Sequence, residues 1–214
     1  MAAEYFCVMC KTPFQNAWPL DAQGCCALCR RGLRNFEEAY CFGAYEGVLR
    51  QLVHLYKYGR MRPLAAPLGV LLAAALPRDR AFDVVVPVPL HWRRRWERGF
   101  NQSELLARAT ARRCGIPMRD AVRRTRATAV QAGLSNSLRR QNVAGVFRVK
   151  RGARVAGMRV LLVDDVMTTG STASSCAAAL KRAGARSVTL LVLARVDRRF
   201  GGAHLAGSSQ QGAS

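Results

Sequence analysis

The spacing of apolar positions along the chain predicts strands and helices in alternation. Residues 39–45 have the pattern of a short strand, and the next segment predicts an amphipathic helix that Gly59 ends. Its apolar face is formed by Leu49, Leu52, Val53 and Tyr56. A second helix is expected over residues 64–76. Residues 83–88 form a valine run stopped by proline, which suits a buried strand.

The second half of the chain continues this alternation. The expected elements are a helix over 104–113 capped by Ser103, an extended piece over 143–149, a strand over 159–163, a helix over 171–183 ended by Gly184, and a strand over 187–196. Strands joined by helices imply an α/β fold, with a parallel, Rossmann-like sheet covered on both faces. Ligands are then expected at the carboxyl ends of the strands.

The two ends of the chain lack this pattern. Residues 1–38 contain five of the eight cysteines and little hydrophobic periodicity, so we expect a small module held together by metal. Residues 39–200 would form the main domain, and the tail 201–214, rich in Gly, Ser, Gln and Ala, is expected to be disordered. The longest apolar stretch is interrupted and shorter than the roughly 20 residues that cross a bilayer, so no membrane segment is expected.

Four N-terminal cysteines have the spacing of a zinc site. Cys7 and Cys10 form one pair, Cys26 and Cys29 form another, and fifteen residues separate the pairs. Four thiolates around a tetrahedral ion leave no open position, so the zinc would be structural. Cys25 is the alternative to Cys26, with a less regular spacing, and reduced cysteines without metal are the alternative to the site. Because the N-terminus lacks a secretory signal, a cytoplasmic location is expected.

The net charge bears on the expected partner. The chain carries a formal charge of +21, and residues 84–163 alone hold eighteen Lys and Arg against three acidic residues. Such a stretch favours a polyanion such as single-stranded DNA, because clustered cations release the counterions condensed on phosphates. Trp92 and Trp96 stand among arginines and would stack on unpaired bases, unless they belong to a packed loop. However, 30 of the 34 basic residues are arginines, so codon composition is an open alternative explanation.

Residues 159–172 have the order expected of a phosphate-binding site. An apolar strand leads to Asp164 and Asp165, and a loop of hydroxyl side chains around one glycine leads directly into a helix. The loop residues are Thr168, Thr169, Gly170, Ser171 and Thr172. Backbone N–H groups at a helix start attract anions, and two adjacent carboxylates suit the vicinal hydroxyls of a sugar. The loop lacks the lysine of a nucleoside triphosphate loop. The alternative is a polar strand end followed by an ordinary helix cap.

This segment resembles the fingerprint of the type I phosphoribosyltransferases, and four further segments narrow the resemblance to the ComF family of competence proteins. They are Tyr56-Lys57-Tyr58-Gly59, Val86-Pro87-Val88-Pro89-Leu90, Arg98-Gly99-Phe100-Asn101-Gln102, and the stretch from Gln131 through Leu134-Ser135 and Arg139 to Asn142-Val143. The resemblance covers the chain up to about Val196. It implies a phosphoribosyltransferase-like domain behind an N-terminal zinc ribbon.

The resemblance also implies roles for single residues. The loop 168–172 would hold the ribose phosphate of phosphoribosyl diphosphate, the two aspartates would hold the ribose hydroxyls as the catalytic pair, and Arg98 with Asn101 would bind the magnesium-bound pyrophosphate. For the segment around Arg98, the alternative is a turn in which Phe100 packs on the core. Lys57 would either reach a phosphate or be a solvated helix end.

Two classes of function follow from these expectations. The first is an enzyme that displaces pyrophosphate from phosphoribosyl diphosphate and transfers ribose phosphate to a nitrogen acceptor, as in nucleobase salvage. The second is a non-catalytic factor that handles single-stranded DNA in natural competence, with the competence helicase as the partner that the resemblance implies.

Overall fold

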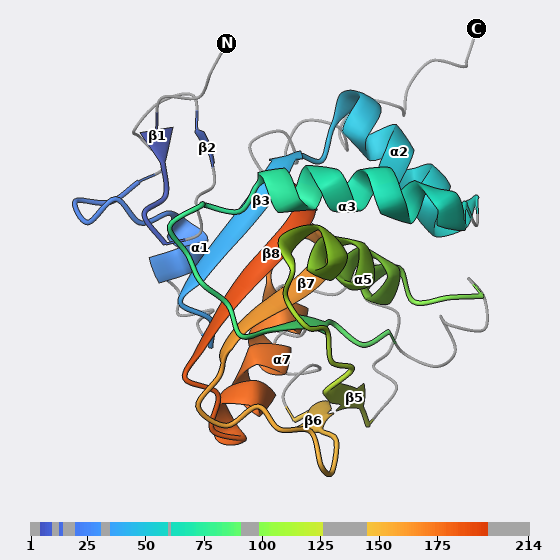
Figure 1. Cartoon of the computed structure of the whole chain (residues 1–214). Coiled ribbons are helices and arrows are strands. Elements are labelled where there is room, and N and C mark those ends of the chain that lie inside the picture. The colour runs from blue at the N-terminus through green and yellow to red at the C-terminus, as the bar shows by residue number, and fades with distance from the viewer. Residues whose placement is uncertain are drawn as a thin grey trace, which may run out of the picture.

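The computed structural model describes residues 5–9, 13–14, 20–30, 35–59, 61–90, 99–125 and 145–196 (Figure 1). Several predictions fall outside these residues. They concern Cys10, the tryptophans at 92 and 96, Arg98, the 131–143 part of the ComF resemblance and the tail 201–214.

Four parallel strands form the central sheet, in the order β3-β8-β7-β4. The strands are β3 (Glu38–Ala44), β4 (Val84–Pro87), β7 (Arg159–Met167) and β8 (Ser187–Arg195). The two long strands, β7 and β8, lie in the middle, where layers on both faces cover them. This placement explains their nearly continuous apolar sequences. The predicted α/β class with a parallel sheet is confirmed.

Three helices pack on one face of the sheet (Figure 1). They are α2 (Gly47–Tyr58), α3 (Ala65–Ala74), which follows the 3-10 turn Arg62–Leu64, and α5 (Gln102–Cys114). Their buried side chains, among them Tyr56, Leu72 and Leu106, join the apolar side chains of β7 and β8. The helices α3 and α5 approach so closely that a Cβ on Gly69 would lie 2.4 Å from the Cβ of Ala109. Only glycine fits at this crossing.

The opposite face is covered by α7 (Ser171–Arg182), with a two-stranded antiparallel ribbon beside it. The ribbon consists of β5 (Val122–Arg124) and β6 (Phe147–Val149). The N-terminal elements are β1 (Tyr5–Phe6), β2 (Pro13–Phe14) and α1 (Ala27–Arg30). Cys7 and Cys26 are buried in the same apolar cluster as the inner side chains of α7. The cysteine-rich residues therefore pack against the core of the main domain.

The structure corrects several predicted boundaries. Strand β7 continues past Val163 to Met167, because its ladder with β8 persists where the apolar run is interrupted. The two acids thus lie inside the strand. Helix α5 begins at Gln102, and the prediction that Ser103 caps it is wrong, because the Ser103 hydroxyl binds Asp164 instead. Strand β5 was not predicted. Among the described residues, no helix combines the length and the hydropathy that a membrane crossing requires.

Candidate functional site

Asp164 and Asp165 lie near the carboxyl end of β7, and a side chain from a different helix holds each of them. Ser103 of α5 donates from Oγ to Asp164 Oδ1 over 2.7 Å, and the Asp165 N–H donates to the same oxygen over 2.9 Å. Lys57, in the last turn of α2, forms an ion pair with Asp165, with 2.8 Å between Nζ and Oδ1. The Lys57 and Asp165 side chains are only 15% and 11% exposed. The packing of α2 and α5 on the sheet therefore fixes this acidic pair.

The surroundings of the pair change the protonation of Asp164. Burial raises the pKa of the Asp164 carboxyl to about 7, and the neighbouring Asp165 charge acts in the same direction. The hydrogen bonds from Ser103 and from the Asp165 N–H, together with the positive charge of Lys57, oppose this rise in pKa. Near neutral pH, Asp164 is therefore poised between a carboxylate, which only accepts hydrogen bonds, and an acid, which also donates one.

The loop after β7 has the geometry of an anion-binding site. Gly170 has a φ of +74°, in the left-handed region that favours glycine, and α7 begins at the next residue. Thr169 Oγ1 and Ser171 Oγ lie 2.8 Å apart, and the Ser171 N–H donates to Thr169 Oγ1 over 3.3 Å. Thr169 and Ser171 are buried, Thr172 is half-buried and Thr168 is exposed. The first N–H groups of a helix have no carbonyl partner within it and carry the positive end of its dipole.

The start of α5 lies beside the acidic pair. Asn101 takes the N-cap position and donates from Nδ2 to the backbone carbonyl that follows β4, over 3.4 Å. Its Oδ1 is buried and has no hydrogen-bond partner among the described residues. Phe100 is buried, with its ring centroid 5.6 Å from that of Tyr56 and 5.3 Å from the guanidinium carbon of Arg62. Phe100 therefore packs on the core, and this packing does not decide the role of Arg98, which lies outside the described residues. The pyrophosphate role of Arg98 and Asn101 stays a prediction.

The chain is similar to a known domain family and to several known proteins. Residues 101–203 match the family model described as Phosphoribosyl transferase domain. The chain is 37% identical over 178 residues to the DNA utilization protein YhgH of Escherichia coli strain K12. The matched stretch covers 79% of this chain and 77% of that protein. It is 32% identical to Competence protein F of Haemophilus influenzae, over 79% of this chain and 78% of that protein. The chain belongs to the ComF family.

A third ComF-family relative is matched over a shorter stretch. The Competence protein ComFC of Bacillus subtilis is 34% identical over 118 residues, which is 55% of this chain and 46% of that protein. Among solved structures, an allosteric regulatory enzyme of purine biosynthesis is 26% identical, with a TM-score of 0.46 over 65% of this chain and 30% of that one.

The site of this ComF-family chain includes two residues whose roles are not evident from the sequence. Ser103 and Lys57 lie far from the aspartates along the chain and meet them only in the folded sheet. Of the two alternatives for Lys57, the solvated helix end is wrong, because its ammonium group is paired and largely buried. Tyr56, its neighbour, donates its hydroxyl to the Gln102 carbonyl over 2.9 Å and ties α2 to the start of α5. The available signal was the segment 56–59, which is part of the ComF resemblance.

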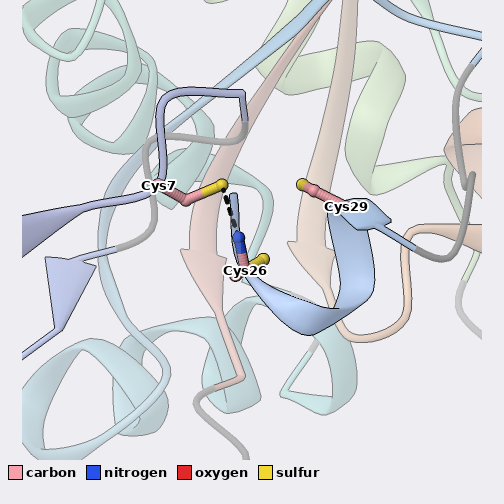
Figure 2. Close-up of side chains that lie close together, drawn as sticks. All are labelled: Cys7, Cys26 and Cys29. Atoms are coloured by element: carbon pink, nitrogen blue, oxygen red, sulfur yellow. Dashed lines mark hydrogen bonds between the residues drawn. The ribbon is translucent and has the colours of Figure 1, made fainter. Parts of the chain in front are cut away.

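The N-terminal cysteines form a second candidate site (Figure 2). The sulfur atoms of Cys7, Cys26 and Cys29 all lie within 4.8 Å of one another, and the Cys26 N–H donates to Cys7 Sγ over 3.3 Å. Zinc–sulfur bonds of about 2.3 Å in a tetrahedron place sulfurs about 3.8 Å apart, so a small contraction closes the group around an ion. Cys25 lies outside the group, and its N–H donates to Asp21 Oδ1 over 2.7 Å. Three of the four predicted ligands therefore come together, and they include Cys26.

Proposed function

We propose that this ComF-family protein binds phosphoribosyl diphosphate at the carboxyl end of β7. The proposal rests on two features that follow one another at the end of this strand. An acidic pair, held by side chains from two helices, is followed directly by a loop of hydroxyl side chains and one glycine, after which α7 begins. The loop is suited to the ribose phosphate, and the acids are suited to the ribose hydroxyls. Magnesium enters as part of the ligand, because it prefers substrate phosphate oxygens and water.

The same site is suited to pyrophosphate displacement. In such a transfer the bond from the ribose anomeric carbon to pyrophosphate breaks, the pyrophosphate leaves with the electron pair, and the acceptor nitrogen bonds to that carbon and loses its proton to water. Asp164 and Asp165 would hold the ribose while positive charge develops on its ring. The proposal has two parts. The protein binds phosphoribosyl diphosphate, and, if it is an enzyme, it transfers the ribose phosphate from this ligand to a nucleobase.

Calorimetric titration with magnesium phosphoribosyl diphosphate tests this proposal. Wild type should bind one ligand per chain, and Asp164→Asn and Asp165→Asn should each weaken binding by about tenfold or more, because a charged hydrogen-bond partner contributes about 1.5–3 kcal/mol. Asp120→Asn is the matched control, since that acid is exposed and pairs with Lys150. Absence of wild-type binding, or equal affinities of all four proteins, would rule the site out.

We also propose that the cysteine group binds a structural zinc ion. The thiolate chemistry and the separations of the three sulfurs support zinc over a hard cation. Cys10, from the predicted set, would supply the fourth ligand.

Handling of single-stranded DNA is a second candidate function, and a basic surface on the β5–β6 ribbon favours it. Arg123 and Arg148 are partners in the ribbon register, so both exposed side chains lie on one face, where like charges destabilise the pair. Arg148 and Arg182 line an open pocket of about 500 Å³. A polyanion bound here would relieve the repulsion. The names of two relatives, DNA utilization protein YhgH and Competence protein F, fit this use.

Anisotropy titration of a labelled single-stranded oligonucleotide at several salt concentrations tests the DNA function. The double variant Arg123→Ala/Arg148→Ala should bind the oligonucleotide more weakly. The slope of log K against log salt concentration should become less steep by about 1.4, because each lost phosphate contact on a single strand removes about 0.7. Arg112→Ala, an exposed arginine at the end of α5, should leave both quantities unchanged. Binding that does not depend on salt would contradict the basic surface. A competence helicase partner and a cytoplasmic location stay predictions.

A further inference from the structure

Three consecutive residues, Asn35, Phe36 and Glu37, connect the cysteine-rich residues to β3. We call residues 35–37 the strap. Asn35 donates from Nδ2 to Ser174 Oγ of α7 over 3.0 Å. Glu37 Oε2 accepts a hydrogen bond from the Val188 N–H over 2.7 Å, and the Glu37 N–H donates to the Val188 carbonyl over 3.0 Å. The Glu37 carboxylate also forms an ion pair with a lysine near the end of α7. The strap is thus fixed to α7 and β8 at several points.

We call residues 168–172 the phosphate loop. Two of the strap residues contact this loop or the first turn of α7 that follows it. A Cβ on Gly170 would lie 3.9 Å from Phe36 Cζ and 3.4 Å from Met167 Sδ, so the Phe36 ring packs beside the loop glycine. Ser174 donates its backbone N–H to the Gly170 carbonyl over 2.8 Å, and its hydroxyl accepts the hydrogen bond from Asn35. Asn35 therefore holds the first turn of α7, and Phe36 supports the glycine where this turn begins.

The strap follows shortly after the cysteine group. Helix α1, which carries Cys29, ends before residue 35. Cys7 and Cys26 are buried in the apolar cluster against which Phe36 also packs. A metal ion held by the cysteines would fix how these residues pack, because metal binding in small modules supplies folding free energy. The position of the strap would then depend on the metal.

We propose that the strap positions the phosphate loop and couples it to the cysteine metal site. Metal bound by the cysteines keeps Asn35 and Phe36 against the start of α7, so that the loop holds its N–H groups in place for an anion. Loss of the metal loosens the strap and weakens phosphate binding. Coupling between two binding sites is reciprocal, so the phosphoribosyl ligand also strengthens metal binding by the same factor. The inference rests on the proposed phosphoribosyl diphosphate site for its ligand, but the positioning of the loop is measurable without ligand.

Hydrogen exchange of the full chain without ligand is the first test. Removing zinc with a chelator should accelerate exchange of the Ser171 and Ser174 amides by about fivefold or more, the lower end of usual coupling between sites. The variants Asn35→Ala and Phe36→Ala should do the same with zinc bound. Tyr40→Phe, which removes a hydrogen bond from Tyr40 to Glu38 in β3, is the matched control and should leave these amides unchanged. Slow exchange of the central β8 amides distinguishes a local change from global unfolding.

Calorimetry with magnesium phosphoribosyl diphosphate is the second test, on zinc-loaded and zinc-free protein. Zinc removal should lower the ligand affinity of wild type and of Tyr40→Phe by about fivefold or more. Asn35→Ala should bind the ligand more weakly than wild type even with zinc bound, and zinc removal should change its affinity less. Unchanged loop exchange on zinc removal and in both strap variants would overturn the coupling, whatever the ligand does. A loop that responds to zinc in a protein that fails to bind phosphoribosyl diphosphate would support the strap and refute the proposed ligand.

Discussion

Lowering the pH from 8 to 6 should weaken the binding of phosphoribosyl diphosphate, because Asp164 then gains a proton. Burial, followed by the charge of Asp165, raises the pKa of the Asp164 carboxyl to about 7. This group is then mostly ionised at pH 8 and mostly protonated at pH 6. One oxygen of Asp164 already accepts hydrogen bonds from Ser103 and from a backbone N–H. If the ribose hydroxyls need the carboxylate form, the affinity falls by about tenfold over this range.

The assay is calorimetry at constant ionic strength at pH 6, 7 and 8, with wild type and Asp164→Asn. The ligand phosphate titrates near pH 6 as well, and the Asp164→Asn variant reports that contribution alone. The stability of the unliganded protein should change in the opposite sense. Because folded Asp164 holds its proton up to about pH 7 and an unfolded aspartate only to about 4, this group lowers stability as the pH rises between these values. Equal pH slopes for both proteins, or tighter wild-type binding at pH 6, would refute the reasoning.

Three further changes have defined outcomes. Lys57→Met leaves a largely buried carboxylate without its cation, so urea unfolding should show a loss of about 2 kcal/mol, and an unchanged midpoint would contradict the ion pair. Gly69→Ala places a methyl group 2.4 Å from the Cβ of Ala109, so thermal unfolding should show a loss of about 1–3 kcal/mol, whereas full stability would mean that α3 and α5 separate freely. Cys29→Ser should lower the zinc content measured by elemental analysis, and Cys114→Ser, at an exposed cysteine outside the group, should not.

The sheet was predictable from the sequence because three of its strands are buried along nearly their whole length. The apolar runs that became β4, β7 and β8 needed no knowledge of their neighbours. The end of β7 was harder to predict, since Asp164 and Asp165 interrupt the apolar run while Asp164 still pairs with Val192 and Met167 with Arg195 in the backbone ladder. Hydropathy reports on side chains, and the length of a ladder is decided by the backbone.

The loop 168–172 between a strand and a helix was predictable because all its parts are adjacent in the chain. The partners of the acids were not, because they come from other elements. Ser103 lies 61 residues before Asp164, and its position just before the expected helix start at residue 104 made capping the local expectation. The pairing of Lys57 with Asp165 depends on how α2 crosses the sheet, which no local pattern encodes. The strap contacts from Asn35 to Ser174 likewise span 139 residues.

The most direct test of the proposed site is to map where magnesium phosphoribosyl diphosphate changes the amide resonances of the isotope-labelled protein. The largest saturable shifts should fall on the loop 168–172 and on Asp164 and Asp165, with the β5–β6 ribbon unaffected. Shifts confined to the ribbon, or none up to millimolar ligand, would contradict a phosphoribosyl site at the end of β7.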